Sequence, residues 1–193
     1  MMGRLSDNSR PPSRRKRDGG AGFTLIELLI TVGTIAILAA IALPNVLRAR
    51  IAANEASALA SLRVIHTAQS TFASECGGNG YAQRLADLVT PPAGSSHAFI
   101  SPDLGADPTL KSGYVVTLEE ENAPGAVDML PAGASCNASA APTVSTYWAG
   151  AGPLHIGITG QRAFAIDRTG VLYQNVGGAA IANPIPGGTQ RVQ

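Results

Sequence analysis

Glu27 is the residue whose chemistry most needs an explanation, because it interrupts an otherwise apolar stretch. The stretch from Phe23 to Leu43 contains 21 residues, and Glu27 is the only charged one. A helix rises 1.5 Å per residue, so this stretch is roughly 30 Å long, the thickness of the hydrocarbon core of a bilayer. A carboxylate within a membrane helix costs roughly 2.5 kcal/mol or more and is rare without a partner. We therefore expect a membrane-spanning helix in which a cationic group meets Glu27.

The residues before this stretch predict its orientation and a processing site. Residues 1–22 contain six basic and two acidic side chains, and Lys and Arg are retained on the cytoplasmic side of a membrane. An ordinary secretory signal has a shorter apolar core followed by small residues at its cleavage site. Here a small residue, Gly22, precedes the apolar stretch instead. We expect residues 1–22 to form a disordered cytoplasmic leader and the chain after the helix to face outward.

Residues 22–29, GFTLIELL, resemble the prepilin signature shared by type IV pilins and type II secretion pseudopilins. The resemblance implies that a membrane peptidase cuts after Gly22 and methylates the new amino terminus of Phe23. It also implies that Glu27 is needed for assembly. Cutting after Gly22 creates an ammonium group on Phe23, and the Glu27 carboxylate of a neighbouring subunit could neutralise that charge and set the axial register.

Pro44 divides the apolar stretch from an Ala-rich segment with helical periodicity. Its missing N–H and its ring should kink or locally unwind a continuing helix, and Gly33 is a second candidate for a bend. Beyond Pro44 the segment up to Glu75 contains no Gly or Pro. Its apolar residues recur at helical spacing and should face the globular part of the chain: Leu47, Ile51, Ala58, Leu62, Ile65 and Phe72.

The two cysteines, Cys76 and Cys136, both fall on the predicted outer side of the membrane, where disulfides persist. We expect a bridge between them, the alternative being two buried thiols. The bridge would tie the Pro/Gly/Ala-rich region 123–142 to the end of the helix. A loop of this length predicts a stabilisation of roughly 4 kcal/mol.

The remaining elements are predicted from short patterns. Residues 81–89 are expected to form a short helix, 90–110 a loop and 119–121 an acidic loop tip. Strands are expected at 113–118 and 143–149. Residues 163–166 and 171–173 flank a turn-rich tetrapeptide and predict a hairpin, which also resembles the closing hairpin of bacterial pilin-like proteins. The Gly/Ala/Pro-rich tail after Asn175 is expected to wrap the sheet edge or fray.

Titratable residues outside these motifs do not form a recognisable catalytic or metal pattern. The three histidines, His66, His97 and His155, lie in segments of different type, and Asp103 and Asp107 lack the spacing of a calcium loop. No nucleophile elbow, phosphate loop or HExxH sequence occurs. From Phe23 onward there are eight basic and eleven acidic residues, so no basic footprint for nucleic acid is present. We expect no enzyme activity, cofactor, metal or nucleic-acid partner.

Together these patterns predict an α+β pilin fold with a long amino-terminal helix packed on a small antiparallel sheet of three to four strands. The expected parts are a leader at 1–22, a membrane or filament-core helix at 23–43, its amphipathic continuation at 44–76 and a globular region at 77–193. The resemblance implies a structural subunit of a type IV pilus-like filament. It would reside in the bacterial inner membrane before joining an extracellular or periplasmic filament. Its implied partners are identical or related subunits, a prepilin peptidase and an inner-membrane assembly platform. A type II secretion pseudopilin and a membrane-anchored adhesion or binding module that never polymerises remain the alternatives.

Overall fold

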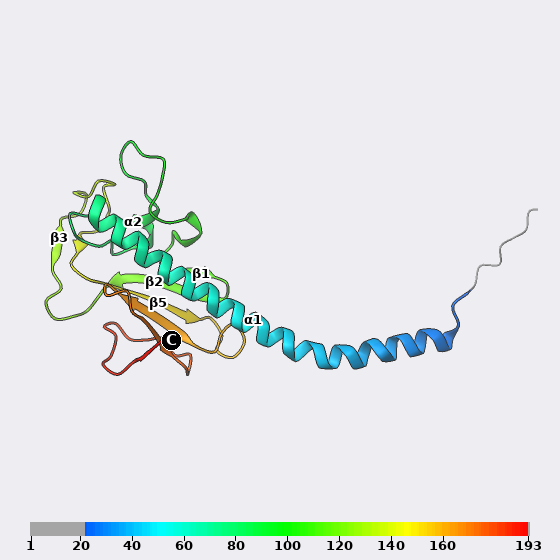
Figure 1. Ribbon diagram of the computed structural model, residues 1–193. Coiled ribbons are helices and arrows are strands. Elements are labelled where there is room, and N and C mark those ends of the chain that lie inside the picture. The colour runs from blue at the N-terminus through cyan, green and yellow to red at the C-terminus, as the bar shows by residue number, and fades with distance from the viewer. Residues whose placement is uncertain (1–21, 193) are drawn as a thin grey trace, which may run out of the picture. The chain divides into compact units, whose positions relative to one another are not determined.

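The computed structural model describes residues 22–192, in which one long helix, α1 (Leu25–Glu75), precedes a sheet-rich region (Figure 1). The predicted leader at 1–22 lies outside the described residues, apart from Gly22. The chain divides into two compact units, one ending at Ala42 and the other beginning at Leu43. Each unit is described by itself.

The described part of the first unit is the apolar beginning of α1. α1 is long and apolar enough to cross a membrane by length and composition. None of its apolar segment is buried within the chain. This is consistent with the membrane-spanning helix predicted from the sequence.

The second unit is built on an antiparallel sheet with the strand order β1-β2-β5-β6-β7-β8. A smaller two-stranded sheet pairs β3 with β4. The strands are β1 (Thr109–Lys111), β2 (Tyr114–Glu120), β3 (Asp128–Leu130), β4 (Thr143–Val144), β5 (Tyr147–Pro153), β6 (Ala163–Asp167), β7 (Leu172–Asn175) and β8 (Gln190–Arg191).

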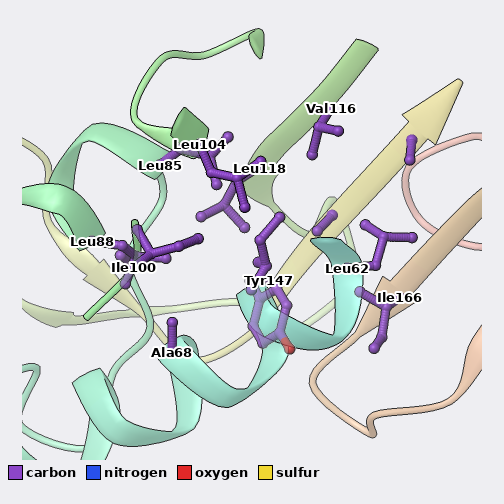
Figure 2. Packing of buried hydrophobic residues seen from close by; sticks show 14 of the residues in the cluster. Leu62, Ala68, Leu85, Leu88, Ile100, Leu104, Val116, Leu118, Tyr147 and Ile166 are labelled. Atoms are coloured by element: carbon purple, nitrogen blue, oxygen red, sulfur yellow. The ribbon is translucent and has the colours of Figure 1, made fainter. Parts of the chain in front are cut away.

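Helix α1 covers one face of the larger sheet with the apolar stripe expected from its periodicity. Ala58, Leu62, Ile65 and Phe72 are buried, whereas Leu47, at the start of the stripe, is exposed. The alternate residues of β2 complete this core, because a strand turns every second side chain to the same face. Figure 2 shows Leu62 of α1 close to sheet residues, among them Ile166 of β6, and Tyr147 of β5 next to the helix. The α+β pilin fold expected from the sequence is confirmed.

Several element predictions need correction. Among the described residues the larger sheet has six strands instead of three or four, because β1 begins within the region expected to be a loop and the tail adds β8. The strand expected at 143–149 is split into β4 and β5, and β5 continues through two glycines to Pro153. The acidic tip partly belongs to β2, which ends at Glu120. The short helix α2 (Leu85–Val89) and a 3₁₀ turn (Pro102–Leu104) complete the fold.

The predicted hairpin is confirmed, since β6 pairs with β7 in the register Ile166 opposite Leu172. Gly170 supplies the positive φ of +75° that its turn needs. Pro44 lies inside α1, and the helix is continuous on both sides of it and through Gly33. A bend at either residue stays a prediction.

Candidate functional site

The first turn of α1 fixes the position of Glu27. The backbone N–H of Glu27 donates to Thr24 Oγ1 at 3.2 Å, and the N–H of Leu28 donates to the Thr24 carbonyl at 3.2 Å. Thr24 is therefore the N-cap residue, and Glu27 occupies the third helical position, which is the Thr-x-x-Glu spacing of a capping box. A negative charge in this turn also interacts favourably with the helix dipole. The spacing and the position in the first turn therefore favour a carboxylate here in addition to the pairing predicted for it.

The side chains of the predicted processing motif are open to the surroundings. Phe23 is 80% exposed, and Gly22 and Glu27 are exposed as well. The salt bridges among residues 22–192 join Lys111 to Asp103 and Arg162 to Glu55, so both lie in the globular unit. The cationic partner expected for Glu27 stays a prediction, and an exposed carboxylate one turn from the start of the helix is accessible to such a partner.

Neither of the two glycines singled out from the sequence is required by local packing. A Cβ atom added at Gly22 or at Gly33 would have no neighbour within 4 Å. Neither residue has a positive φ. A side chain at Gly22 would therefore leave the described fold unchanged. If glycine is required at this position, the requirement must come from another protein that recognises the motif.

The apolar segment from Phe23 to Leu47, which includes the first part of α1, is uncovered in the described chain. Its large side chains are all at least half exposed: Phe23, Leu25, Ile26, Leu28, Leu29, Ile30, Val32, Ile35, Ile37, Leu38, Ile41, Leu43, Val46 and Leu47. Water disfavours so continuous an apolar surface, because apolar patches of this size mark contacts with protein or membrane. This segment is suited to lipid or to the helices of other chains.

An ion pair between the buried Glu55 and the partly exposed Arg162 holds the second part of α1 against the sheet. The Glu55 carboxylate accepts hydrogen bonds from Arg162 Nη2 at 2.7 Å and Nε at 2.9 Å. Its other oxygen accepts the backbone N–H groups of Gln161 at 2.9 Å and Arg162 at 3.1 Å. The Arg162 guanidinium also lies 5.3 Å from the centroid of the Phe164 ring. All of these bonds hold the segment just before β6 against α1.

The contacts with Arg162 and Gln161 lower the pKa of Glu55. Burial acts to raise the pKa of this carboxyl group, but the hydrogen bonds from Arg162 and Gln161 outweigh it, so the pKa is lowered. Glu55 was not among the residues singled out from the sequence. A signal was present, because Glu55 lies four residues after Ile51 and three before Ala58, in phase with the apolar stripe.

The two cysteines are joined, as expected from the sequence. The S–S distance between Cys76 and Cys136 is 1.99 Å, and their Cα atoms lie 4.8 Å apart. The backbone N–H of Cys136 also donates to the Cys76 carbonyl at 3.2 Å. Next to the bridge, Asn137 Nδ2 donates to the carbonyls of Asp87 at 2.6 Å and Thr90 at 3.0 Å. The bridge therefore ties the 123–142 region both to the end of α1 and to α2.

Asp87 in α2 is buried beneath this region. One of its oxygens accepts the Ala140 N–H at 3.2 Å, while Oδ2 has no hydrogen-bond partner in the structure. Burial raises the pKa of Asp87, although the Ala140 N–H and the nearby Arg84 act in the opposite direction. The protonated form is favoured because the charged form is desolvated without full compensation.

The remaining titratable candidates are not brought together. His66 Nδ1 lies 2.6 Å from the hydroxyl of Tyr147, whereas His97 and His155 are exposed in separate loops. Asp103 pairs with Lys111 at 2.6 Å, and this pairing lowers its pKa.

Asp107 has a structural task that the sequence did not reveal. Its carboxylate accepts the backbone N–H of Leu85, at the start of α2, and that of Leu118 in β2. Burial raises its pKa. Within residues 22–192 no three His, Cys, Asp or Glu side chains are grouped so that they could hold a metal ion.

Comparison with known proteins finds relatives among type IV pilins. The type IV major pilin protein PilA of Myxococcus xanthus is 48% identical over 38% of this chain and 46% of its own length. The type IV wide pilus major component PilA4 of Thermus thermophilus is 42% identical over 36% of this chain and 51% of its own. The chain thus spans about half the length of the curated relatives it matches. No protein-family model and no solved structure matches it. The resemblance to type IV pilins is confirmed by these two relatives.

Proposed function

We propose that this chain is a structural subunit of a type IV pilus-like filament. The observation that carries the proposal is the uncovered apolar half of α1 directly after the GFTLIELL motif. An apolar helix of this length is stable in a bilayer before assembly and among other apolar helices afterwards. The two relatives are named as major components of type IV pili, which favours the pilus over the type II secretion alternative.

The maturation that we propose follows the motif. A prepilin peptidase cuts after Gly22 and the amino group of Phe23 is methylated. The subunit waits in the bacterial inner membrane with its amino terminus cytoplasmic, and an assembly platform then stacks it on identical or related subunits. In the filament the Phe23 ammonium of one subunit faces the Glu27 carboxylate of another. The subunit serves as a building block, without a catalytic role.

The test is mass spectrometry of the amino-terminal peptide from membranes and from filaments sheared off cells. Methylated Phe23 in sheared filaments is the expected result. Methylated Phe23 in membranes alone would favour a pseudopilin or a minor component, and an uncut leader in both fractions would overturn the proposal. Cut chains that never form filaments would support the adhesion or binding module.

Gly22→Leu is the informative variant for the cleavage step. Because a Cβ at Gly22 meets no neighbour, this substitution leaves the described fold intact. We expect uncut chains that still carry the Cys76–Cys136 bridge. The matched control is Gly33→Leu, which also places a side chain in open space and should be cut normally.

A further inference from the structure

The polar side chains in the apolar part of α1 lie on one side of the helix. From Leu25 to Leu43 the only polar side chains are those of Glu27, Thr31 and Thr34. They stand at positions i, i+4 and i+7 of a helix with 3.6 residues per turn, so they fall within an arc of about 60°. We refer to these three residues as the acceptor stripe, which lies in the blue part of α1 in Figure 1.

The hydroxyl groups of the stripe can accept hydrogen bonds but have no free proton to donate. Thr31 Oγ1 donates to the Leu28 carbonyl at 2.8 Å, and Thr34 Oγ1 donates to the Thr31 carbonyl at 2.9 Å. A hydroxyl has one donor and two acceptor lone pairs, and a carboxylate only accepts. Glu27 is exposed and takes no part in the two salt bridges of residues 22–192. The stripe therefore presents oxygen acceptors along about 10 Å of helix and is suited to a partner with N–H donors.

Two acceptor stripes are poorly matched to each other. Such a pair would place acceptors against acceptors and one Glu27 carboxylate against another, which is unfavourable in an apolar medium. The donors that a helix does not use internally lie in its first turn, whose N–H groups have no intrahelical partner. Cutting after Gly22 would add the amino group of Phe23 to these donors. The groups that match the stripe thus lie elsewhere on the same chain, and a contact between unlike surfaces of two copies propagates instead of closing.

We propose that the acceptor stripe of one subunit binds the amino terminus of a second copy, with the Phe23 ammonium between Glu27 and Thr31. A singly methylated amino group retains two N–H donors, one for the Glu27 carboxylate and one for Thr31 Oγ1. Because the Cβ atoms of residues i and i+4 of a helix are about 5–6 Å apart, one nitrogen can reach both acceptors. Thr31 is then a positioning residue for assembly outside the GFTLIELL motif. The inference rests on the membrane residence and the cutting after Gly22 proposed above, and it concerns residues of the first unit alone.

The proposed contact sets the register of two helices that span the membrane in the same direction. The Phe23 nitrogen of one copy lies level with Leu29 of the other, midway between Glu27 and Thr31, so the helices are offset by about six residues or about 9 Å. Leu38 follows Thr34 by four residues, continues the line of the stripe and is 67% exposed. With this offset Leu38 of one copy lies beside Val32 of the other.

Photo-crosslinking in vesicles tests the side of the helix and the register. The full chain, cut at Gly22, carries benzoylphenylalanine in place of Leu38 and is reconstituted in phosphatidylglycerol vesicles. The matched control carries the same group in place of Ala40, which is also exposed but lies two residues further and so on nearly the opposite side of the helix. Mass spectrometry verifies the cut and the Cys76–Cys136 bridge, and circular dichroism verifies the fold.

We expect crosslinked dimers from the Leu38 position, attached within about one turn of Val32 of the other copy. The Ala40 position should give mainly lipid adducts. The dimer yield from the Leu38 position should fall by about tenfold or more in Gly22→Leu, because the uncut chain has no free amino group on Phe23 and loses a hydrogen bond between charged groups.

Exchanging two neighbouring residues tests the role of Thr31. Thr31→Val/Val32→Thr moves the hydroxyl by about 100° around the helix without changing the composition of the chain. Insertion into the membrane and cutting at Gly22 should therefore be unaffected. We expect the dimer yield from the Leu38 position to fall about threefold, which is typical of the loss of one interhelical hydrogen bond in a membrane. Val32→Thr alone retains Thr31 and should retain the yield.

Several results would overturn the proposal. These are equal dimer yields from the two positions, lipid adducts alone from both, and dimers that persist in the uncut chain. Dimers from the Ala40 position alone would show that the helices pair through the opposite side. An unchanged yield in the exchange variant would remove Thr31 from the contact. Methylated Phe23 in sheared filaments together with any of these results would leave the proposed filament function intact, whereas an uncut leader in cells would overturn that function itself.

Discussion

Glu55 Oε2 and Arg162 Nη2 lie 2.7 Å apart and join α1 to the segment that leads into β6. The two residues are 107 positions apart in the sequence. Their hydrogen bonds form at the same end of the sheet as the Asn54–Thr159 bond. The pair therefore fixes this end of the sheet to the part of α1 that belongs to the second unit.

Removing the Glu55 carboxylate should destabilise the globular unit. Glu55→Ala leaves two backbone N–H groups and the Arg162 guanidinium without their acceptor, and we expect a loss of about 2–3 kcal/mol in the free energy of unfolding. The value lies below that of a fully buried pair because the Arg162 side chain is 37% exposed. Urea unfolding of the full chain in detergent, followed by Trp148 fluorescence, measures it. Glu75→Ala, at an exposed position of the same helix, should change the value by no more than about 0.5 kcal/mol.

The same carboxyl group should make the unit sensitive to acid. Its pKa in the folded state lies below the ordinary value of 4.5, so its contribution is complete above that pH and is lost as the pH falls further. We expect the urea concentration at the midpoint of unfolding to fall as the pH is lowered below about 4.5. In Glu55→Gln the part of this fall that is due to Glu55 should be missing. An equal drop in both proteins would show that other groups cause the acid sensitivity.

Asp87 should have the opposite pH dependence. Its folded pKa is raised above the ordinary value of 3.8, so its protonated form stabilises the fold, and this contribution is lost as the pH rises through the folded value. Asp87→Asn retains an acceptor for the Ala140 N–H and removes the charge. We expect its stability at pH 7 to equal or exceed that of the unsubstituted chain. The difference should shrink when the pH is lowered toward 4, and a strong loss of stability at pH 7 would contradict this account.

The Cys76–Cys136 bridge should contribute a large share of the stability. It closes a loop with a sequence separation of 60, which corresponds to about 4 kcal/mol in the chain-entropy model. Cys76→Ser/Cys136→Ser should therefore unfold at a clearly lower urea concentration. The unsubstituted chain treated with dithiothreitol should unfold at a similar concentration. If the reduced and oxidised chains unfolded alike, the bridge would have no stabilising role.

Variants of Glu27 can separate its two possible roles. Glu27→Gln retains the capping-box side chain at the third helical position but removes the charge, whereas Glu27→Ala removes both. If charge pairing with Phe23 drives assembly, both variants should yield few sheared filaments while their leaders are still cut and methylated. Glu75→Gln, an exposed glutamate in the same helix, should assemble normally. Wild-type filament amounts from Glu27→Gln would leave capping as the role and contradict the pairing.

Local patterns were sufficient for the elements that depend on nearby residues. The apolar helix, its Ala-rich continuation and the β6–β7 hairpin were predicted because periodicity and turn residues act over a few positions. The disulfide was predicted because both cysteines lie on one side of the predicted membrane helix. The strand number was wrong because β1 and β8 are short and are stabilised by the neighbouring strands to which they bind rather than by their own composition.

The sequence by itself determined that a 21-residue apolar stretch with one carboxylate follows a basic segment and a glycine, which defines the amino-terminal motif. Only the tertiary structure decided what Glu55, Asp87 and Asp107 do. Their partners come from segments distant in the chain. Almost every residue type has a backbone N–H group, so the sequence does not show which of these groups donates to a given carboxylate. The exposure of the aliphatic residues Leu154, Ile156 and Ile158 was decided in the same way, because burial depends on what packs against a residue and not on its own hydrophobicity.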